Sequence, residues 1–287
     1  MNTKVTISPN NVRDAVNAYC QAKGISKSDL ARRISVSPAV LSNLENGKWE
    51  SIAQEMLLRI YNVVRPTTSQ WAEVGTINYN TVAAVCEEAR RYGRMQAIIG
   101  GAGYGKTTAL RAFERKQKNV YYLACQKSMK PRQFFLELLQ TMGLHGTGLT
   151  LYEMIRRVAD TLNVQDAPLL VIDEAGKLTQ TLLLHLHDLR NATEHRAGLV
   201  LAGVDYFKGN LEKAVAREKE GMPEFFSRVA AWEVLEAPTA AECRAVCQAN
   251  GLNNPEQIKT VCRARNYRTL ASSIINELNN PTTDEKE

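Results

Sequence analysis

The 287-residue sequence contains no run of about 18 apolar residues, the length that a membrane-spanning helix needs. Its first residues, Met1 to Val5, also lack the apolar stretch of a signal peptide, so we expect a cytoplasmic protein with no membrane partner. Cysteines are few and dispersed: the six include no CxxC pair, and the closest two, Cys243 and Cys247, have no histidine nearby. Because zinc sites and disulfide frameworks need ligands at short, regular spacings, neither is predicted.

The excess of positive charge is small, with 36 Lys and Arg residues against 30 Asp and Glu residues, a net charge of +6. Nine basic and five acidic residues lie in positions 1–65, so most of the excess belongs to the N-terminal part. An apolar fraction of 44% and this length predict a folded protein of about two domains. The charge indicates an anionic partner only weakly, because its effect depends on where the charges lie.

Residue patterns divide the chain into five parts. A stretch with Pro66 and several Thr and Ser residues has no apolar face to bury and marks a linker. We predict a helical N-terminal domain, this linker, an α/β domain, a small helical domain and a flexible tail, over residues 1–65, 66–77, 78–235, 236–278 and 279–287.

Four short apolar runs in the middle part alternate with helix-length segments, at residues 95–99, 120–123, 169–172 and 199–202. This alternation predicts a parallel sheet covered by helices on both faces. In the part that follows, Thr239 and Glu242 have the spacing of a capping box, Asn254-Pro255 marks a second helix start, and a third helix is expected over residues 269–278.

Residues 98–108 read IIGGAGYGKTT and contain the full G-x-x-x-x-G-K-T pattern between an apolar strand and a helix. In such a loop, glycines let backbone N–H groups face a phosphate, and the N-terminus of the following helix adds a favourable dipole. Lys106 then reaches the β and γ phosphates and Thr107 holds Mg²⁺, so ATP and Mg²⁺ are the expected ligands. The predicted nucleotide-binding residues are Gly100, Gly101, Ala102, Gly103, Tyr104, Gly105, Lys106, Thr107 and Thr108.

A second motif completes the predicted site, since the apolar run at 169–172 ends in Asp173 and Glu174. Asp173 is placed to hold Mg²⁺ and Glu174 to polarise an attacking water molecule. The two motifs together predict ATP hydrolysis and not only binding.

Phosphoryl transfer also needs positive charge, which a neighbouring subunit often supplies as an arginine. Arg228, after the two phenylalanines at 225–226, and Arg268, at the start of the last predicted helix, are the candidates. For each, the alternative is an ordinary surface arginine.

The N-terminal part has the pattern of a helix-turn-helix. Ser26 can cap one short helix, Ser37-Pro38 can start a second, and Gly47 ends it. The second helix of this motif enters the major groove. It offers only Ser42 and Asn43 for base contacts, so weak sequence preference is expected, with phosphate contacts from Lys27, Arg32, Arg33 and Lys48. The alternative is a helical bundle that docks a protein.

A second basic group, Lys127, Lys130 and Arg132, surrounds a proline-containing loop after the second predicted strand. Loops on rigid scaffolds commonly present binding residues, so DNA contact is one reading of this group and a solvated surface is the other.

With these parts in order, the sequence resembles AAA+ ATPases of the MuB type, the transposition protein B family of phage Mu and related transposons. The resemblance covers nearly the whole chain. Beyond the helix-turn-helix and the linker, its motifs are GGAGYGKT at 100–107, LVIDEA at 170–175, DLR at 188–190, GLVLAG at 198–203 and FSR at 226–228.

The resemblance implies an ATP-dependent filament or ring on double-stranded DNA that presents target DNA to a transposase and disassembles on hydrolysis. It also implies that Arg228 acts in trans as an arginine finger and that Arg268 senses the γ-phosphate from the lid. Relatives carry a polar residue after the glycine that ends the fourth strand. This chain has Val204 there, with Asp205 next, so the polar sensor is either displaced or missing and slow hydrolysis is expected. Two alternatives remain: a transcriptional regulator with an ATP switch, and a replication helicase loader.

Overall fold

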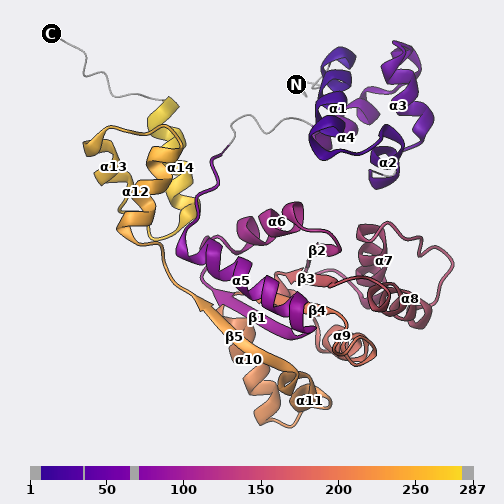
Figure 1. The fold of residues 1–287 in the computed structure, drawn as a ribbon, viewed down its shortest axis with the longest axis vertical. Helices are drawn as coiled ribbons and strands as arrows, with labels where there is room; N and C mark the ends of the chain where they lie inside the picture. Colours follow the sequence, from indigo (N-terminus) through magenta and orange to yellow (C-terminus); the bar gives the residue numbers. More distant parts are fainter. Residues whose placement is uncertain (1–7, 35, 65–70, 280–287) are drawn as a thin grey trace. The chain divides into compact units, whose positions relative to one another are not determined.

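The structure, a computed structural model, describes residues 8–34, 36–64 and 71–279. The chain forms two compact units, Met1–Gln70 and Trp71–Glu287 (Figure 1). The predicted domain boundary at residue 65, residues 66–70 of the predicted linker and all but the first residue of the predicted tail lie outside the described residues.

The first unit is helical. Its elements are α1 (Pro9–Lys23), α2 (Lys27–Arg33), α3 (Pro38–Glu45), the 3-10 helix η1 (Trp49–Ser51) and α4 (Gln54–Val64). The Ser26 hydroxyl accepts a hydrogen bond from the N–H of Asp29 (3.1 Å) and so caps α2 as predicted, and the Ser37 hydroxyl caps α3. Leu30 and Leu41 of the α2–α3 pair are buried in one apolar cluster with side chains of α1 and α4.

The second unit contains a five-stranded parallel sheet with the order β2-β3-β4-β1-β5. Its strands are β1 (Met95–Gly100), β2 (Val120–Ala124), β3 (Leu169–Asp173), β4 (Gly198–Gly203) and β5 (Val229–Leu235). The first four are the predicted apolar runs. β5 is an edge strand with several exposed residues, and the sequence pattern did not reveal it.

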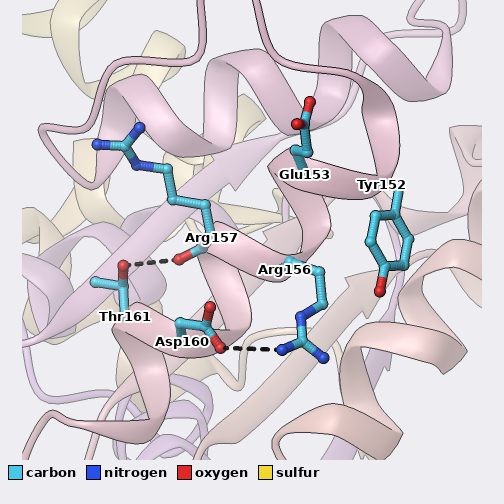
Figure 2. A pocket seen from close by; sticks show the side chains of 6 residues that line it. All are labelled: Tyr152, Glu153, Arg156, Arg157, Asp160 and Thr161. Atoms are coloured by element: carbon cyan, nitrogen blue, oxygen red, sulfur yellow. Dashed lines mark hydrogen bonds and ion pairs between the residues drawn. The ribbon is translucent and has the colours of Figure 1, made fainter.

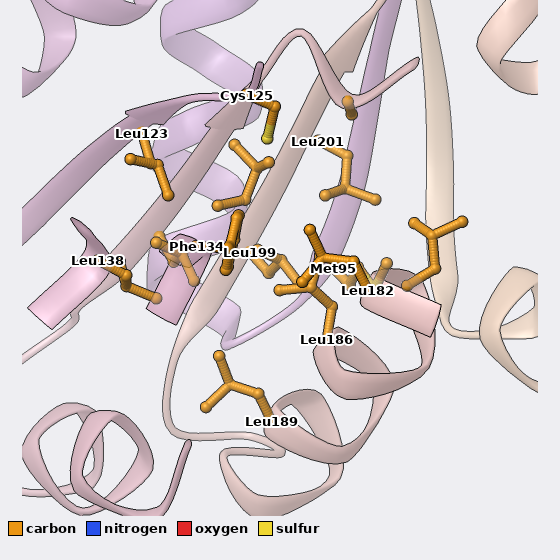
Figure 3. Packing of buried hydrophobic residues seen from close by; sticks show 14 of the residues in the cluster. Met95, Leu123, Cys125, Phe134, Leu138, Leu182, Leu186, Leu189, Leu199 and Leu201 are labelled. Carbon is orange, nitrogen blue, oxygen red and sulfur yellow. The ribbon is translucent and has the colours of Figure 1, made fainter. Parts of the chain in front are cut away.

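Helices cover both faces of this sheet, as the alternation predicted. One face packs against α5 (Ile77–Tyr92) and α6 (Lys106–Lys116). The other packs against α7 (Pro131–Thr141), α8 (Leu151–Asn163), α9 (Gln180–Ala192), α10 (Asp205–Ala216) and α11 (Met222–Ser227). Figure 3 shows this second core, in which Met95, Leu199 and Leu201 of the strands meet Phe134 and Leu186 of the helices.

The last three helices form a lid around a separate apolar cluster: α12 (Ala240–Ala249), α13 (Pro255–Val261) and α14 (Tyr267–Asn279). The predicted capping box is present, because Thr239 and Glu242 exchange hydrogen bonds at the start of α12. Trp71 and Val74, which fall in the predicted linker, pack against this cluster. The chain segment before α5 therefore packs against the lid.

The mixed α/β fold with an N-terminal helix-turn-helix is confirmed. Among the described residues, no helix is long and apolar enough to cross a membrane.

Candidate active site

The phosphate loop lies where the sequence placed it, between the end of β1 and the start of α6. Gly103 and Gly105 have φ angles of 81° and 88°, a left-handed conformation that glycine adopts without strain. A Cβ at Gly103 would lie 2.7 Å from Oδ1 of Asn266 and would displace that side chain. The loop thus has the tight curvature and the helix N-terminus that a phosphate group requires.

Lys106 is buried at the base of this loop, with only 9% of its surface exposed. Its Nζ donates hydrogen bonds to the carbonyl oxygens of Gly100 (2.5 Å) and Gly101 (3.0 Å). Burial lowers the pKa of Lys106, although the carboxylates of Asp173, Glu174 and Asp205 oppose this shift. The ammonium group is therefore held at the loop, next to three acidic side chains.

Asp173, at the end of β3, has an exposed fraction of only 2%. Its Oδ2 accepts a hydrogen bond from the Thr107 hydroxyl (2.6 Å), and its Oδ1 accepts one from the N–H of Glu174 (2.8 Å). Magnesium prefers oxygen ligands and is usually held by one or two carboxylates together with substrate phosphates and water. The Thr107 and Asp173 pair fits that requirement.

Glu174 follows directly, in a left-handed backbone conformation with a φ angle of 58°. Such a conformation costs a residue other than glycine roughly 1–2 kcal/mol. Its carboxylate is about half exposed and lies 3.5 Å from Nζ of Lys177. The side chain therefore stands at the open side of the site, where solvent water can reach it.

Two further side chains reach this site that sequence reasoning missed. The Tyr122 hydroxyl, on β2, donates to Oδ2 of Asp173 (2.7 Å), and burial raises the pKa of Tyr122, which keeps the hydroxyl protonated. The buried Asn78, on α5, donates to the carbonyl oxygens of Tyr104 (3.0 Å) and Glu236 (2.8 Å). Tyr122 could have been noticed as a polar-tipped residue two positions before the end of a buried strand.

Arg268 lies beside the loop of its own chain. The N–H of Tyr267 donates to the carbonyl oxygen of Gly103 (2.9 Å), and a Cβ at Gly103 would meet Cβ of Arg268 at 3.2 Å. The charge of Arg268 also contributes to the lowered pKa of Lys106. The start of α14 is thus docked on the phosphate loop.

Arg228 lies far from the loop of its own chain. It directly precedes β5, whose Val229 is paired with Met95 at the start of β1, whereas the loop follows Gly100 at the other end of β1. Five residues of strand span roughly 16 Å. Nη1 of Arg228 instead contacts Oε1 of Glu194 (2.7 Å). Arg228 and Lys106 therefore stand at opposite ends of the sheet.

The predicted DNA-binding residues of the first unit lie on its surface, but some already have partners. Nζ of Lys27 lies 2.6 Å from Oε2 of Glu45, and Arg32 is paired with Asp29. Arg33, Ser42 and Lys48 are exposed, whereas Asn43 is half-buried. The exposed face of α3 therefore presents little that could distinguish one base from another.

The second basic group, Lys127, Lys130 and Arg132, follows the carboxyl end of β2. The phosphate loop follows the carboxyl end of β1, so both lie at the same edge of the parallel sheet. Lys127 and Lys130 are exposed in the segment between β2 and α7. Arg132 is exposed as well, but its Nη1 donates to the carbonyl oxygen of Leu149 (2.5 Å).

A surface hollow of about 640 Å³ lies along α8 (Figure 2), lined by Tyr152, Glu153, Arg156, Arg157, Asp160 and Thr161. None of the predicted site residues borders it. In the described part of the chain, no three or more His, Cys, Asp or Glu side chains are grouped to hold a metal ion by themselves. A Mg²⁺ ion held by Thr107 and Asp173 would therefore need further ligands, such as substrate phosphates and water.

Comparison with known families places this site in a class. Residues 89–211 match the AAA domain family, and residues 16–63 match a helix-turn-helix family. The chain thus combines an AAA-type ATPase domain with an N-terminal helix-turn-helix domain.

The whole chain has a more specific relative. It is 23% identical over 248 residues to the Mu-like prophage FluMu DNA transposition protein B of Haemophilus influenzae, covering 84% of this chain and 85% of that protein. Together with the two domain matches, this similarity confirms the predicted resemblance to MuB-like AAA+ ATPases.

Solved structures with some similarity include the replication initiator DnaA bound to AMPPCP and single-stranded DNA, with 15% identity, a TM-score of 0.49, and coverage of 72% of this chain and 62% of that chain. Another is Drosophila ORC bound to DNA, with 16% identity, a TM-score of 0.42, and coverage of 70% of this chain and 54% of that chain. The chain thus spans less than two thirds of either of these structures.

Proposed function

We propose that this protein is an ATP-dependent DNA-binding ATPase that assembles on duplex DNA with little regard to sequence and delivers target DNA to a transposase. Hydrolysis of ATP then drives disassembly. The relative named for DNA transposition supports the biological setting, and the helix-turn-helix supports DNA as a partner.

The observation that carries the proposal is the separation of Arg228 from the phosphate loop along β1 and β5. A finger that cannot reach its own site can act only on the site of a second copy. Contacts in which one face meets a different face of the next subunit generate rings or helical filaments rather than two-fold dimers. This arrangement therefore favours assembly over a discrete dimer.

Each residue at the site has a role in this proposal. Lys106 contacts the β and γ phosphates, Thr107 and Asp173 hold Mg²⁺, and Glu174 orients the attacking water. Bound there, Mg²⁺ would neutralise charge on the phosphate oxygens. Arg228 from the adjacent copy stabilises the charge of the transition state, and Arg268 links the γ-phosphate to the lid.

We also propose that the displaced acid, Asp205, makes hydrolysis slow. Val204 directly precedes α10, whose first residue is Asp205, and the charge of Asp205 acts to raise the pKa of Lys106. An acid near the γ-phosphate would repel it, whereas a neutral polar group would bind it.

Electron microscopy of the protein with ATP and random-sequence duplex DNA tests the proposal. Regular protein-coated duplex is expected with ATP, and only naked duplex with Lys106→Ala, because that variant loses its contact with the phosphates. A discrete dimer bound at a single sequence would contradict the proposal and favour a transcriptional regulator. Unchanged assembly of Lys106→Ala would show that nucleotide does not control assembly.

A further inference from the structure

Tyr122 supplies a hydrogen bond to the candidate metal site from outside the two phosphate motifs. Only 7% of its surface is exposed, and its hydroxyl donates to Oδ2 of Asp173 (2.7 Å). The same oxygen accepts the Thr107 hydroxyl (2.6 Å). Two donors therefore converge on the one carboxylate oxygen that faces the start of α6.

The sheet register explains why the hydroxyl reaches that oxygen. Tyr122 is paired with Val171, and Ala124 is paired with Asp173, so Tyr122 lies two positions before the acid on the neighbouring strand. Both side chains point to the same face of the sheet, because residues two apart on a strand share a face. The tyrosine ring then spans the distance along the strands.

A residue of α6 packs against the ring of Tyr122. The guanidinium carbon of Arg111 lies 4.3 Å from the centre of the Tyr122 ring, within the range of a cation–π contact. Arg111 is on the same helix as Thr107, so one rigid element positions both the hydroxyl donor and the clamp over the ring.

We propose that Tyr122 is a positioning residue that fixes the Asp173 carboxylate in the orientation needed to hold Mg²⁺, an inference that rests on the proposed function of Thr107 and Asp173. A carboxylate can rotate about its last bond, and each hydrogen bond from the protein removes some of that freedom. The N–H of Glu174 fixes Oδ1, and Tyr122 and Thr107 fix Oδ2. Groups that hydrogen-bond to a metal ligand typically change metal affinity 10- to 100-fold when they are removed.

The test measures Mg²⁺ dependence rather than turnover. Binding of a fluorescent ATP analogue is titrated with Mg²⁺ and repeated in EDTA, using the full chain with Tyr122→Phe. The half-saturating Mg²⁺ concentration is expected to rise about tenfold or more. Affinity for the metal-free analogue should remain unchanged, because Lys106 and the loop are untouched.

The neighbouring residue provides a matched control. Tyr121 is on the same strand and accepts a hydrogen bond from Nε2 of Gln165 (2.6 Å), away from Asp173. Tyr121→Phe therefore removes a hydroxyl and one hydrogen bond without touching the candidate metal site, and its Mg²⁺ curve should match that of the parent protein. Equal Mg²⁺ curves for the parent protein and both variants, or equal shifts in both variants, would overturn the proposal.

Two more variants separate the possible failures. Asp173→Asn should abolish the Mg²⁺ dependence. If it does not, the proposed metal site fails, and the role of Tyr122 fails with it. If Asp173→Asn acts as expected and Tyr122→Phe does not, only the role of Tyr122 fails. If thermal unfolding shows that Tyr122→Phe does not fold, Arg111→Met is measured instead, because Arg111 is exposed and contacts the Tyr122 ring. A severalfold rise in the half-saturating Mg²⁺ concentration would support the proposal, and no rise would overturn it.

Discussion

The backbone of Glu174 couples the two acids at the end of β3. Its left-handed conformation turns the N–H toward Oδ1 of Asp173 while its own carboxylate points to the open side of the site. A glycine would adopt this conformation at no cost, so an acid here carries strain that its fold does not need. The catalytic role proposed for Glu174 would account for this strain.

Replacing Glu174 by Gln keeps the shape and the backbone but removes the acceptor for a water proton. We expect ATP turnover to fall about 10²- to 10⁴-fold, the usual contribution of general base catalysis, while nucleotide binding is retained. Steady-state phosphate release and binding of a fluorescent ATP analogue measure the two quantities. Glu212→Gln, an exposed acid on α10, is the control. Normal turnover in Glu174→Gln would remove Glu174 from its role.

Glu242 joins three parts of the second unit. Its Oε2 accepts hydrogen bonds from the N–H and hydroxyl of Thr239, and its Oε1 accepts one from the N–H of Ile77 (2.7 Å) and one from the Tyr267 hydroxyl (3.2 Å). The start of α12, the start of α5 and the start of α14 thus meet at one carboxylate. Burial alone would raise the pKa of Glu242, but these hydrogen bonds lower it below its usual 4.5.

Because the pKa of Glu242 is lower in the folded state, its stabilisation is complete above the unfolded value and is lost as the pH falls through the folded value. We expect Glu242→Gln to lower the free energy of unfolding by about 1 kcal/mol at pH 7, a small value because the group is only partly buried. Below pH 4.5 the difference from the parent protein should shrink. Thermal unfolding from pH 7 to pH 3.5 measures it, with the exposed Glu256→Gln as control. A difference that does not change with pH would contradict the argument.

At the level of elements, the sequence predicted those whose patterns are local. β1, β3 and β4 are buried throughout and β2 is mostly buried, so all four appear as apolar runs. Ser26, Ser37 and Thr239 mark helix starts through their own side-chain hydrogen bonds. β5, with the sequence VAAWEVL, was missed although six of its seven residues are apolar, and only Val229 and Leu235 at its two ends are buried. This strand is defined by its pairing with β1 rather than by burial, and its own residues do not reveal that pairing.

The same distinction applies to the site. Both phosphate motifs could be predicted because each is contiguous in sequence, and the structure brings Thr107 and Asp173 into contact. Tyr122 and Asn78 were missed because their roles depend on strand register and on a helix packed across the sheet. The distance of Arg228 from its own loop likewise required the pairing of β5 with β1.

The segment between β2 and α7 allows a prediction about DNA. If Lys127 and Lys130 contact phosphates, the double variant Lys127→Gln with Lys130→Gln should weaken binding to any duplex and reduce the slope of log affinity against log salt by about 2. Fluorescence anisotropy at several salt concentrations measures the slope. Lys213→Gln with Lys219→Gln removes the same charge from the region of α10 and should leave the slope unchanged. Equal slopes in both double variants would exclude this segment.

At the scale of the whole molecule, the two ends of the sheet carry complementary halves of the proposed catalytic site. Lys106→Ala keeps the arginine but loses the phosphate site, and Arg228→Ala keeps the phosphate site but loses the arginine. Each variant alone should be inactive. Their mixture should recover part of the parent activity. Lys106→Ala does not assemble by itself, but an Arg228→Ala copy still binds ATP, and its phosphate site can receive Arg228 from a Lys106→Ala neighbour. ATP turnover across mixing ratios measures the recovery.

The surface variant Arg217→Ala is the control for that mixture, and it should be active alone. A mixture no more active than its two components would show that Arg228 does not act between copies, and full activity of Arg228→Ala alone would show that it does not act at all.

If Arg228 acts between copies, as proposed, its distance from its own phosphate loop also determines how activity depends on protein concentration. In an open row of copies, the terminal site at one end receives no arginine, and the arginine at the other end has nothing to enter. Short rows therefore have a larger share of sites without an arginine than long rows have, and a closed ring has no such site. Turnover per molecule should accordingly fall on dilution even while ATP remains saturating, because shorter rows have fewer complete sites per copy.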